Sequence, residues 1–298
     1  MNEYNKSNLA EGWKPFDIFN NKEFVDLYSK YRNTETCKIC GNQAFIFKIP
    51  VFGYLLMQVY LSKNMEIDKF LQESLDICSQ KKIPKIEIVT LPRDALNKYP
   101  CEHEGTYVIY LNQNNERIWK NIKKETRADI RKAEKNGVIV EQRKNIEDFE
   151  RWWKIYELTG KRGNFVIQQY DFVADVFKNE NISRLFIASV NDKIVAGAFI
   201  LISNYPFYWL GASLPEFWKF GCTGLIQWEI IKWSKKMNFA FYDLGGALKN
   251  DKHGPTGFKR HFGGKFRDIN TYQIEINPLK SKMIDAAVKL RYMLKKSH

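Results

Sequence analysis

The residue types best suited to chemistry gather in one segment near the C-terminal end of the sequence. Residues 239–267, FAFYDLGGALKNDKHGPTGFKRHFGGKFR, begin with an apolar run, turn through two glycines and cross a polar loop. The segment then continues as GFKRHFGG over residues 257–264. Glycine allows a backbone to approach a ligand closely, and lysine and arginine supply positive charge. The segment is therefore predicted to form one wall of an active site.

One carboxylate lies within this segment, at Asp243, just before Gly245 and Gly246. A carboxylate at the end of a strand can act as a general base, but an aspartate before two glycines also stabilises a turn. The structural role is favoured for Asp243, with Gly245 and Gly246 shaping the turn at the site.

The sequence does not contain an evident nucleophile paired with a base. No Ser-His-Asp or Cys-His arrangement stands out. The histidines are His103, His253, His261 and His298. A covalent enzyme intermediate is therefore not expected.

The cysteines raise the question of a metal site. Cys37 and Cys40 form a CxxC pair, and Cys101 and His103 follow at irregular spacing. Structural zinc sites use two regularly spaced ligand pairs, which this pattern does not match. The five cysteines are expected to be free thiols, and no metal is predicted.

Composition limits the class of partner. The 298 residues carry a formal net charge of +13, with a pI near 9.3, and their apolar content is that of a folded protein. Such a charge favours polyanionic partners: nucleic acid, nucleotide phosphates or an anionic membrane surface. No signal peptide or membrane-spanning run is evident, which predicts a cytoplasmic protein without a membrane span, although peripheral membrane contact stays open.

Strands and helices alternate around the chemical segment. Helical periodicity predicts helices at residues 16–33, 66–81, 113–136, 146–161, 170–179, 222–237 and 278–298. Strand patterns fall at residues 36–40, 44–52, 54–61, 85–91, 106–111, 137–142, 184–192, 193–203, 205–213, 239–244 and 271–276. Both halves follow a similar order, which predicts a mixed α/β fold of two related lobes. The predicted parts are an N-terminal lobe (1–111), a basic connecting helix (112–136), a C-terminal lobe (137–277) and a basic C-terminal helix (278–298).

The predicted helix at 113–136 is unusually basic. Its inward face is apolar, and Gly137 suits its C-terminal end. The outward cations include Lys120, Lys123, Lys124 and Arg127. Two interpretations stay open: a solvated helix face, or a surface that contacts phosphates.

The order of several segments resembles the Fem-type (FemABX) aminoacyltransferases and their BioF2-like acyltransferase relatives. The resemblance extends from about residue 106 to the last strand. It depends on TRADIRKAEKNGVIVEQ, FYWLGAS, LIQWEIIKWSKKMNF, YDLGG and GFKRHFGG, taken in that order. It implies two lobes like those of the GNAT (N-acetyltransferase) superfamily, each with a mostly antiparallel mixed sheet flanked by helices. The coiled-coil arm of some members has no counterpart here.

The resemblance also implies a reaction and several site residues. An amino acid would pass from aminoacyl-tRNA to an amine of a cell-wall precursor or peptide, by direct attack. Lys259 would carry the electrostatic role, and Phe258 would stack on the terminal base of the tRNA. Their positive charge, rather than the resemblance, makes further residues candidates for phosphate contacts on the donor: Arg260, Lys265, Lys120, Lys123, Lys124 and Arg127. The acceptor would meet Arg162, Tyr170, Tyr208 and Trp209, of which the two strand residues, Tyr208 and Trp209, suit core packing equally well.

The donor is the sharpest open question. Enzymes of the GNAT superfamily bind the CoA pyrophosphate through a Gln/Arg-x-x-Gly-x-Gly/Ala loop before a helix. Here the corresponding residues, 217–224, have Trp218 at the first motif position and Thr223 at the last. This departure favours tRNA, with no separate cofactor. An acyl-CoA- or acyl-carrier-dependent N-acyltransferase acting on an amino sugar or amino acid is the alternative, and a non-catalytic pair of lobes that binds RNA or a precursor is a third.

Overall fold

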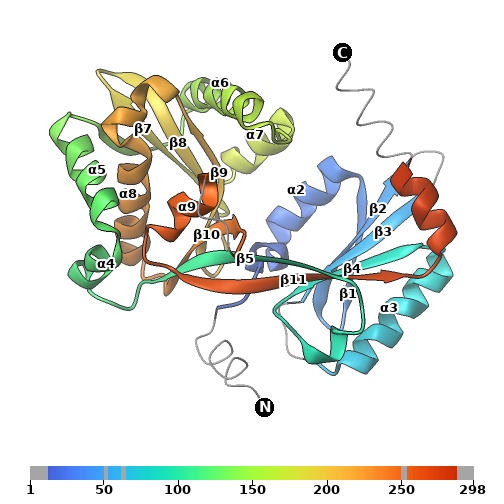
Figure 1. Cartoon of the computed structure of the whole chain (residues 1–298). Helices are drawn as coiled ribbons and strands as arrows, with labels where there is room; N and C mark the ends of the chain where they lie inside the picture. Colours follow the sequence, from blue (N-terminus) through green and yellow to red (C-terminus); the bar gives the residue numbers. More distant parts are fainter. Residues whose placement is uncertain (1–12, 50–52, 62–64, 250–253, 287–298) are drawn as a thin grey trace. The chain divides into compact units, whose positions relative to one another are not determined.

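The computed structural model describes residues 13–49, 53–61, 65–249 and 254–286. The chain divides into two compact units. The first consists of residues 1–104 and 268–298, and the second of residues 105–267. Strands β5 (Cys101–Tyr110) and β11 (Lys265–Glu275) each pass from one unit into the other along the chain (Figure 1).

The first unit is a mixed sheet with helices. Its strands follow the order β1-β2-β3-β4-β11, in which only the β3–β4 pair is parallel. Helix α3 makes the crossover that a parallel pair requires, and it buries Phe70, Leu71 and Cys78 against the sheet. The elements in this unit besides β5 and β11 are η1 (Asp17–Asn20), α2 (Lys22–Arg32), β1 (Thr34–Ile39), β2 (Asn42–Ile49), β3 (Gly53–Tyr60), α3 (Ile67–Lys81), β4 (Lys85–Thr90) and η2 (Asp94–Leu96).

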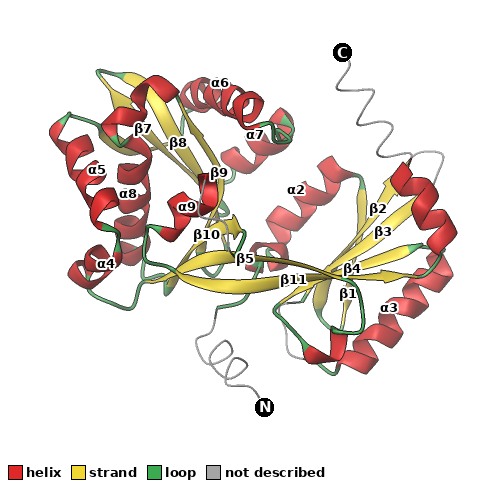
Figure 2. Cartoon of the chain, viewed as in Figure 1, coloured by secondary structure: helices red, strands yellow, loops and turns green. Residues whose placement is uncertain are grey.

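The second unit contains the chemical segment. Its strands follow the order β5-β10-β9-β8-β7-β6, and only the β9–β10 pair is parallel. Helices cover both faces of this sheet, with α5 and α8 on one face and α6 and α7 on the other (Figure 2). The elements are α4 (Asn115–Asn121), α5 (Lys124–Lys135), β6 (Ile139–Arg143), α6 (Ile146–Gly163), α7 (Tyr170–Lys178), β7 (Ser183–Val190), β8 (Lys193–Ile202), β9 (Pro206–Ser213), η3 (Pro215–Phe220), α8 (Cys222–Lys236), β10 (Phe241–Ala247) and α9 (Gly254–Arg260).

Alternation along β8 explains the two helical layers. Ala198 and Ile200 belong to the core cluster that includes residues of α5 and α8. Phe199 points to the other face, where its ring lies 5.7 Å from that of Trp152 in α6. Because successive side chains of a strand point to opposite faces, a strand that is apolar at every position requires cover on both sides. The burial of β8 therefore fixes the three-layer arrangement of this unit.

The basic helix predicted at 113–136 is two helices, α4 and α5. The backbone of Ile122 is extended (ψ 138°), and its side chain is buried. The Lys123 amide donates to the His261 carbonyl at 2.9 Å, outside the helix. Arg127 donates to the Lys120 carbonyl at 2.9 Å and to the Trp119 carbonyl at 3.3 Å. The Arg127 guanidinium thus supplies donors to the last turn of α4, where the Trp119 carbonyl also accepts from the Ile122 amide at 3.1 Å, so the chain can break there without a glycine or proline.

The unit boundaries also differ from the predicted ones at 111, 136 and 277. The structure divides the chain within β5 and β11, at 104/105 and 267/268. Helices α4 and α5 lie inside the second unit, where Ile118, Ile130 and Ala133 enter its core. Sequence reasoning places boundaries in loops, whereas here two strands are shared between the units. The C-terminal helix is described only over residues 278–286, so the remainder of that prediction lies outside the described residues.

The helices are of ordinary length for a folded domain. The longest helix in the described ranges, α6, has 18 residues, which agrees with the expected fold without a coiled-coil arm. Within the same ranges, no helix combines the length and apolarity that a membrane span requires. The segment around Lys259, expected as a loop, is instead the short helix α9, with Pro255 near its start, where a missing N–H has no cost.

Candidate active site

Strands β9 and β10 separate at the centre of the second unit. The pairing between them joins Phe207 to Asp243, and no further pair is formed by their described residues. Each strand also carries an irregularity close to this point. Trp209 is an extra residue in β9, since Leu210 pairs with Phe199 and Tyr208 with Ile200. Bulges re-aim side chains and are frequent beside active sites, which makes the point of separation the candidate site.

The bulge in β10 depends on Gly245. The register shifts between Asp243 and Gly246 opposite β5, and Gly245 has a φ of +75°. A Cβ at Gly245 would lie 2.6 Å from the Tyr208 carbonyl oxygen. Only glycine meets both requirements, because it tolerates positive φ and needs no space for a side chain. A Cβ at Gly246, by contrast, would meet no atom within 4 Å, and this residue contributes its carbonyl instead.

Lys259 of α9 supplies the positive charge at this point. Its Nζ donates to the Gly246 carbonyl at 2.7 Å and lies 5.8 Å from the centroid of the Tyr208 ring. The side chain is half-buried. Burial lowers the pKa of Lys259 to about 8, and the charge of Asp243 partly opposes this shift. Lys259 is therefore still mostly protonated at neutral pH, but it is far more poorly solvated than a surface lysine.

Hydrogen bonds from an amide and a hydroxyl hold Asp243 in place. It is buried, and it accepts one bond from the Gly245 amide at 2.8 Å and another from the Thr106 hydroxyl. The Thr106 hydroxyl also lies 2.9 Å from the Gly245 carbonyl oxygen. These contacts tie the carboxylate to the bulge, which is the geometry of a residue that shapes a turn. They also place a negative charge close enough to act on Lys259.

The other predicted donor contacts near Lys259 have different surroundings. The ring of Phe258 is half-buried against the core and lies 5.1 Å from the ring of Phe262. Arg260 is exposed at the end of α9. Lys265 lies on β11, where its Nζ is 4.9 Å from the centroid of the Tyr110 ring. The packing of Phe258 leaves it poorly placed to stack on a base.

The basic residues of α4 and α5 divide into two groups. Lys120, Lys123 and Lys124 are exposed, whereas the guanidinium of Arg127 binds the carbonyls at the end of α4. Lys123 Nζ also lies 3.1 Å from His261 Nε2, next to α9. Burial, followed by the charges of Lys123 and Arg260, lowers the pKa of His261. The contact between Lys123 and His261 therefore connects the surface of the three lysines to the segment that carries Lys259. Arg127 has a structural role.

The predicted acceptor residues do not form one group. Tyr208 is beside Lys259, and burial raises its pKa to about 12. Trp209 points to the opposite face, with its ring 5.6 Å from those of Phe172 and Phe199. Tyr170 donates to Glu150 at 3.4 Å on the outer side of α6 and α7. Of these three, only Tyr208 is placed at the separation of the strands.

Arg162, the remaining acceptor candidate, contacts the far end of β9. Its guanidinium donates to the Ser213 carbonyl at 3.2 Å and lies 5.1 Å from the centroid of the Trp218 ring. Thr106 is a site residue that sequence reasoning missed. It lies 137 residues from Asp243, and a threonine in a strand gives no local signal of such a contact.

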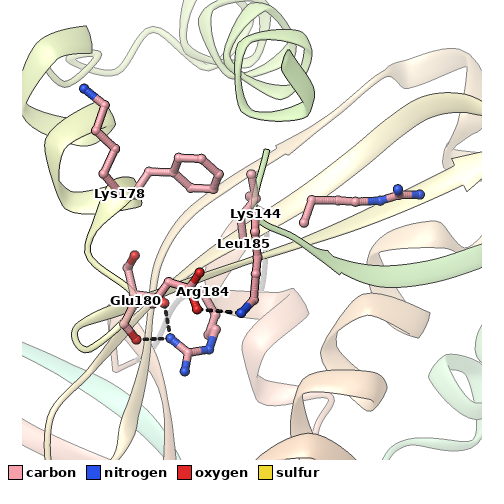
Figure 3. A pocket seen from close by; sticks show the side chains of 8 residues that line it. Lys144, Lys178, Glu180, Arg184 and Leu185 are labelled. Atoms are coloured by element: carbon pink, nitrogen blue, oxygen red, sulfur yellow. Dashed lines mark hydrogen bonds and ion pairs between the residues drawn. The ribbon is translucent and has the colours of Figure 1, made fainter. Parts of the chain in front are cut away.

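A hollow at the β6–β7 edge is lined by cations but is already neutralised (Figure 3). Lys144 is paired with Glu180, and Lys178 with Asp175. Arg184 donates to the Glu180 carbonyl. The hollow is therefore an ion-pair cluster that stabilises the sheet edge, and it contributes nothing to the candidate site. Its lining residues are Arg143, Lys144, Phe177, Lys178, Glu180, Ser183, Arg184 and Leu185.

The cysteines do not assemble into a metal-binding group. Cys40 Sγ lies 3.2 Å from Glu73 Oε2, and all five cysteines are free. Among the described residues, no three His, Cys, Asp or Glu side chains gather closely enough to hold a metal ion.

A known family model matches part of the second unit. Residues 120–260 match the family model described as the acetyltransferase (GNAT) domain. Residues 120–260 are a GNAT domain. The match covers α5 to α9 and includes Tyr208, Asp243 and Lys259 of the candidate site, whereas Thr106 lies before it.

Solved structures extend the likeness to the whole chain. The crystal structure of FemX is 15% identical, with a TM-score of 0.68, and the match covers 90% of this chain and 97% of that chain. The C-terminal domain of a putative lysylphosphatidylglycerol synthetase from Agrobacterium fabrum is 11% identical, with a TM-score of 0.60 and coverages of 95% and 94%. L-PGS from Bacillus licheniformis is 13% identical, with a TM-score of 0.59 and coverages of 89% and 94%. No curated protein sequence matches the chain.

These findings confirm the resemblance drawn from the sequence. The chain has the two-lobed mixed α/β fold of Fem-type acyltransferases, and its GNAT domain makes it a transferase of the acyl-transferring class. The candidate site lies where β9 and β10 part. What is transferred, and to what, depends on the side chains at that point.

Proposed function

We propose that this protein transfers an aminoacyl group from aminoacyl-tRNA to an amine of a cell-wall precursor or peptide. The observation that carries the proposal is the half-buried Lys259 ammonium, fixed to the Gly246 carbonyl where β9 and β10 separate. The acceptor amine attacks the ester carbonyl directly. The new C–N bond forms as the C–O bond to the ribose breaks, and the amine proton passes to the leaving ribose oxygen.

Lys259 acts electrostatically in this reaction. Attack on the ester places negative charge on the carbonyl oxygen and then on the leaving oxygen. A poorly solvated ammonium stabilises such charge more strongly than one in bulk water, because the local dielectric is lower. Its bond to Gly246 fixes the ammonium before the reaction begins. Asp243 keeps Lys259 protonated by its nearby charge and remains bound to Thr106 and Gly245.

The donor is assigned from the charge of the same unit. Lys120, Lys123 and Lys124 are exposed on α4 and at the start of α5, and Lys123 contacts His261 directly after α9. A polyanion that follows these lysines would reach the segment of Lys259. The names of the similar structures, FemX and lysylphosphatidylglycerol synthetase, accord with aminoacyl transfer. The reaction belongs in the cytoplasm, where charged tRNA is available, and it needs no separate cofactor.

A CoA thioester is the alternative donor. Helix α8 begins at Cys222 after the N-cap residue Gly221, which has no side chain to cap it, and this leaves backbone amides available to a phosphate. However, a Cβ at Gly221 would lie 2.4 Å from the Asp129 carbonyl oxygen, so α5 packs closely against this turn. That packing, together with Trp218 in the first motif position, favours tRNA over CoA.

One assay separates these donors. The purified protein is incubated with candidate amine acceptors and either charged total tRNA or a set of CoA thioesters, and products are identified by mass spectrometry. Transfer from tRNA that ribonuclease abolishes is expected. Transfer that requires a CoA thioester and survives ribonuclease would replace the proposed donor. Binding of charged tRNA without turnover from either donor would indicate a non-catalytic protein.

A further inference from the structure

Trp218 is the most exposed aromatic side chain in the described part of the chain. It lies in η3, and 55% of its surface is exposed. Its indole Nε1 donates to the Ser213 hydroxyl at 2.8 Å, and the Arg162 guanidinium lies over the ring, 5.1 Å from its centroid. Arg162 in turn donates to the Ser213 carbonyl at 3.2 Å. The indole is therefore fixed in orientation although it is largely in water.

These contacts leave one face of the indole open. The guanidinium of Arg162 covers one face, so the exposed surface must come mainly from the other face and the edge. Packing alone does not account for a large aromatic ring held with more than half of its surface in water. An indole that is rigid, open on one face and polarised by a cation on the other is suited to stacking on a flat ring.

The surroundings of Trp218 favour a flat ring that carries phosphate. Lys219, which follows Trp218 in η3, is exposed, and so is Lys161, which precedes Arg162 in α6. The Arg162 guanidinium contacts the indole itself. A small hollow adjoins the ring at the end of β9. It is lined by Val195, Ala196, Ser213, Leu214, Phe217, Trp218, Cys222 and Thr223. Aromatic rings interleaved with cations are the usual means of binding a nucleobase and its adjoining phosphates.

Strand β9 links this position to the candidate active site. Tyr208, beside Lys259, and Ser213, bonded to Trp218, lie five positions apart along β9, a distance of about 17 Å. The reacting group and a base of the same donor can therefore occupy the two ends of the strand. Phe258 is less suited than Trp218 to stack on the base of the donor, because its ring packs against that of Phe262.

We propose that Trp218 is a stacking platform for a nucleobase of the acyl donor, with Arg162 and Ser213 holding the indole in place. This proposal rests on the proposed function, because the stacked base belongs to the acyl donor. Two donors carry such a base: aminoacyl-tRNA at its single-stranded 3′ end, and CoA in its adenine. The platform itself requires only that a base binds there, so it can be tested without turnover.

The test is equilibrium binding of two probes to the full chain. The probes are a short single-stranded RNA ending in CCA and, separately, CoA. Trp218→Leu is expected to weaken binding of the RNA roughly tenfold or more, because a stacked base loses its aromatic partner. Trp218→Phe retains an aromatic face and is expected to weaken binding less. The RNA is also expected to quench the emission of the wild-type protein more than that of Trp218→Phe.

Two variants control for structural effects. Phe165→Leu removes another exposed aromatic ring, 43% exposed, and is expected to leave binding of both probes unchanged. Ser213→Ala removes the hydroxyl that holds Nε1 but keeps the ring, and is expected to weaken binding by a smaller factor than Trp218→Leu. If Trp218→Leu does not fold, as judged by its thermal transition, the comparison of Trp218→Phe and Ser213→Ala with the wild type decides the proposal.

The outcomes separate the platform from the donor. Loss of RNA binding alone supports both the platform and a tRNA donor. Loss of CoA binding alone supports the platform but overturns the tRNA donor, and loss of both supports the platform for either source of the base. Unchanged binding of both probes to the Trp218 variants, an equal loss in Phe165→Leu, or failure of the wild type to bind either probe would overturn the platform.

Discussion

The Lys259 ammonium donates a hydrogen bond to the Gly246 carbonyl oxygen at 2.7 Å, across the bulge of β10. The two residues are 13 positions apart, and the contact turns the cation toward the point where β9 and β10 part. Gly245 allows the bulge in β10, and the bulge exposes the Gly246 carbonyl oxygen. That oxygen fixes the ammonium of Lys259, which α9 carries.

Removing this cation should affect the reaction far more than the fold. For Lys259→Ala, kcat/KM is expected to fall roughly 100-fold or more, the usual effect of losing one stabilising donor at a developing oxyanion. The thermal transition should change little, since the variant also removes the cost of burying the charge. Lys232→Ala, on the outer side of α8, serves as a matched lysine control and should keep wild-type rates. Wild-type turnover by Lys259→Ala would reject the electrostatic role.

The pH dependence of the rate follows from the pKa of Lys259, which burial lowers to about 8. If the ammonium is the active form, kcat/KM should decline as pH rises through 8. In Lys259→Arg that decline should disappear, because a guanidinium stays charged throughout this range. Rates of both proteins between pH 6 and 10 provide the measurement. If kcat/KM declines with the same midpoint in the wild type and in Lys259→Arg, the decline comes from the titration of a group other than Lys259.

The same pKa predicts that stability rises with pH, whereas the rate falls. Lys259 has a lower pKa in the folded state than its ordinary 10.5, so between pH 8 and 10.5 the unfolded chain binds more protons than the folded one. The free energy of unfolding contributed by this group therefore rises with pH across that window. Relative to Lys259→Met, the wild type should gain stability from pH 8 to 10.5, as read from urea midpoints. A constant difference between the two proteins would show that the ammonium is not desolvated.

Thr106 is expected to act through Asp243. In Thr106→Val the buried carboxylate loses a hydroxyl donor, and the free energy of unfolding should fall by about 1–3 kcal/mol. Thr106→Ser restores the hydroxyl and should recover most of that loss, as measured by urea unfolding. Equal stability of the valine and serine variants would mean that the Thr106–Asp243 bond contributes nothing.

The exposed lysines of α4 and α5 should matter for RNA binding. Changing Lys120, Lys123 and Lys124 together to Glu is expected to weaken binding of tRNA and to make the slope of log K against log salt shallower by roughly two. A control with the same change of charge is Lys22, Lys38 and Lys69, all exposed in the first unit. If both triple variants lose affinity equally, the effect comes from net charge. An unchanged slope in the first variant would show that this face is only solvated.

Much of the fold could be predicted because hydrophobic periodicity is a local property. The pattern placed most strands and the helices α3, α6 and α8 close to their observed ranges. The break at Ile122 could not be predicted, because a buried isoleucine at helical spacing gives the same pattern whether or not the helix continues. It depends on bonds from Arg127 and on the contact of Lys123 with His261. The helix α9 was missed because its glycines indicated a loop.

The sequence by itself determined the fold class, the acyl-transfer family resemblance, and the segment in which the candidate site lies. It could do so because residue order and local composition carry that information. Only the tertiary structure decided which side chains meet. It brought Thr106 to Asp243 across 137 residues, placed Tyr208 and Trp209 on opposite faces, and left Trp218 rather than Phe258 open to a ligand. Such contacts depend on strand order and register, which bring together residues that no local pattern connects.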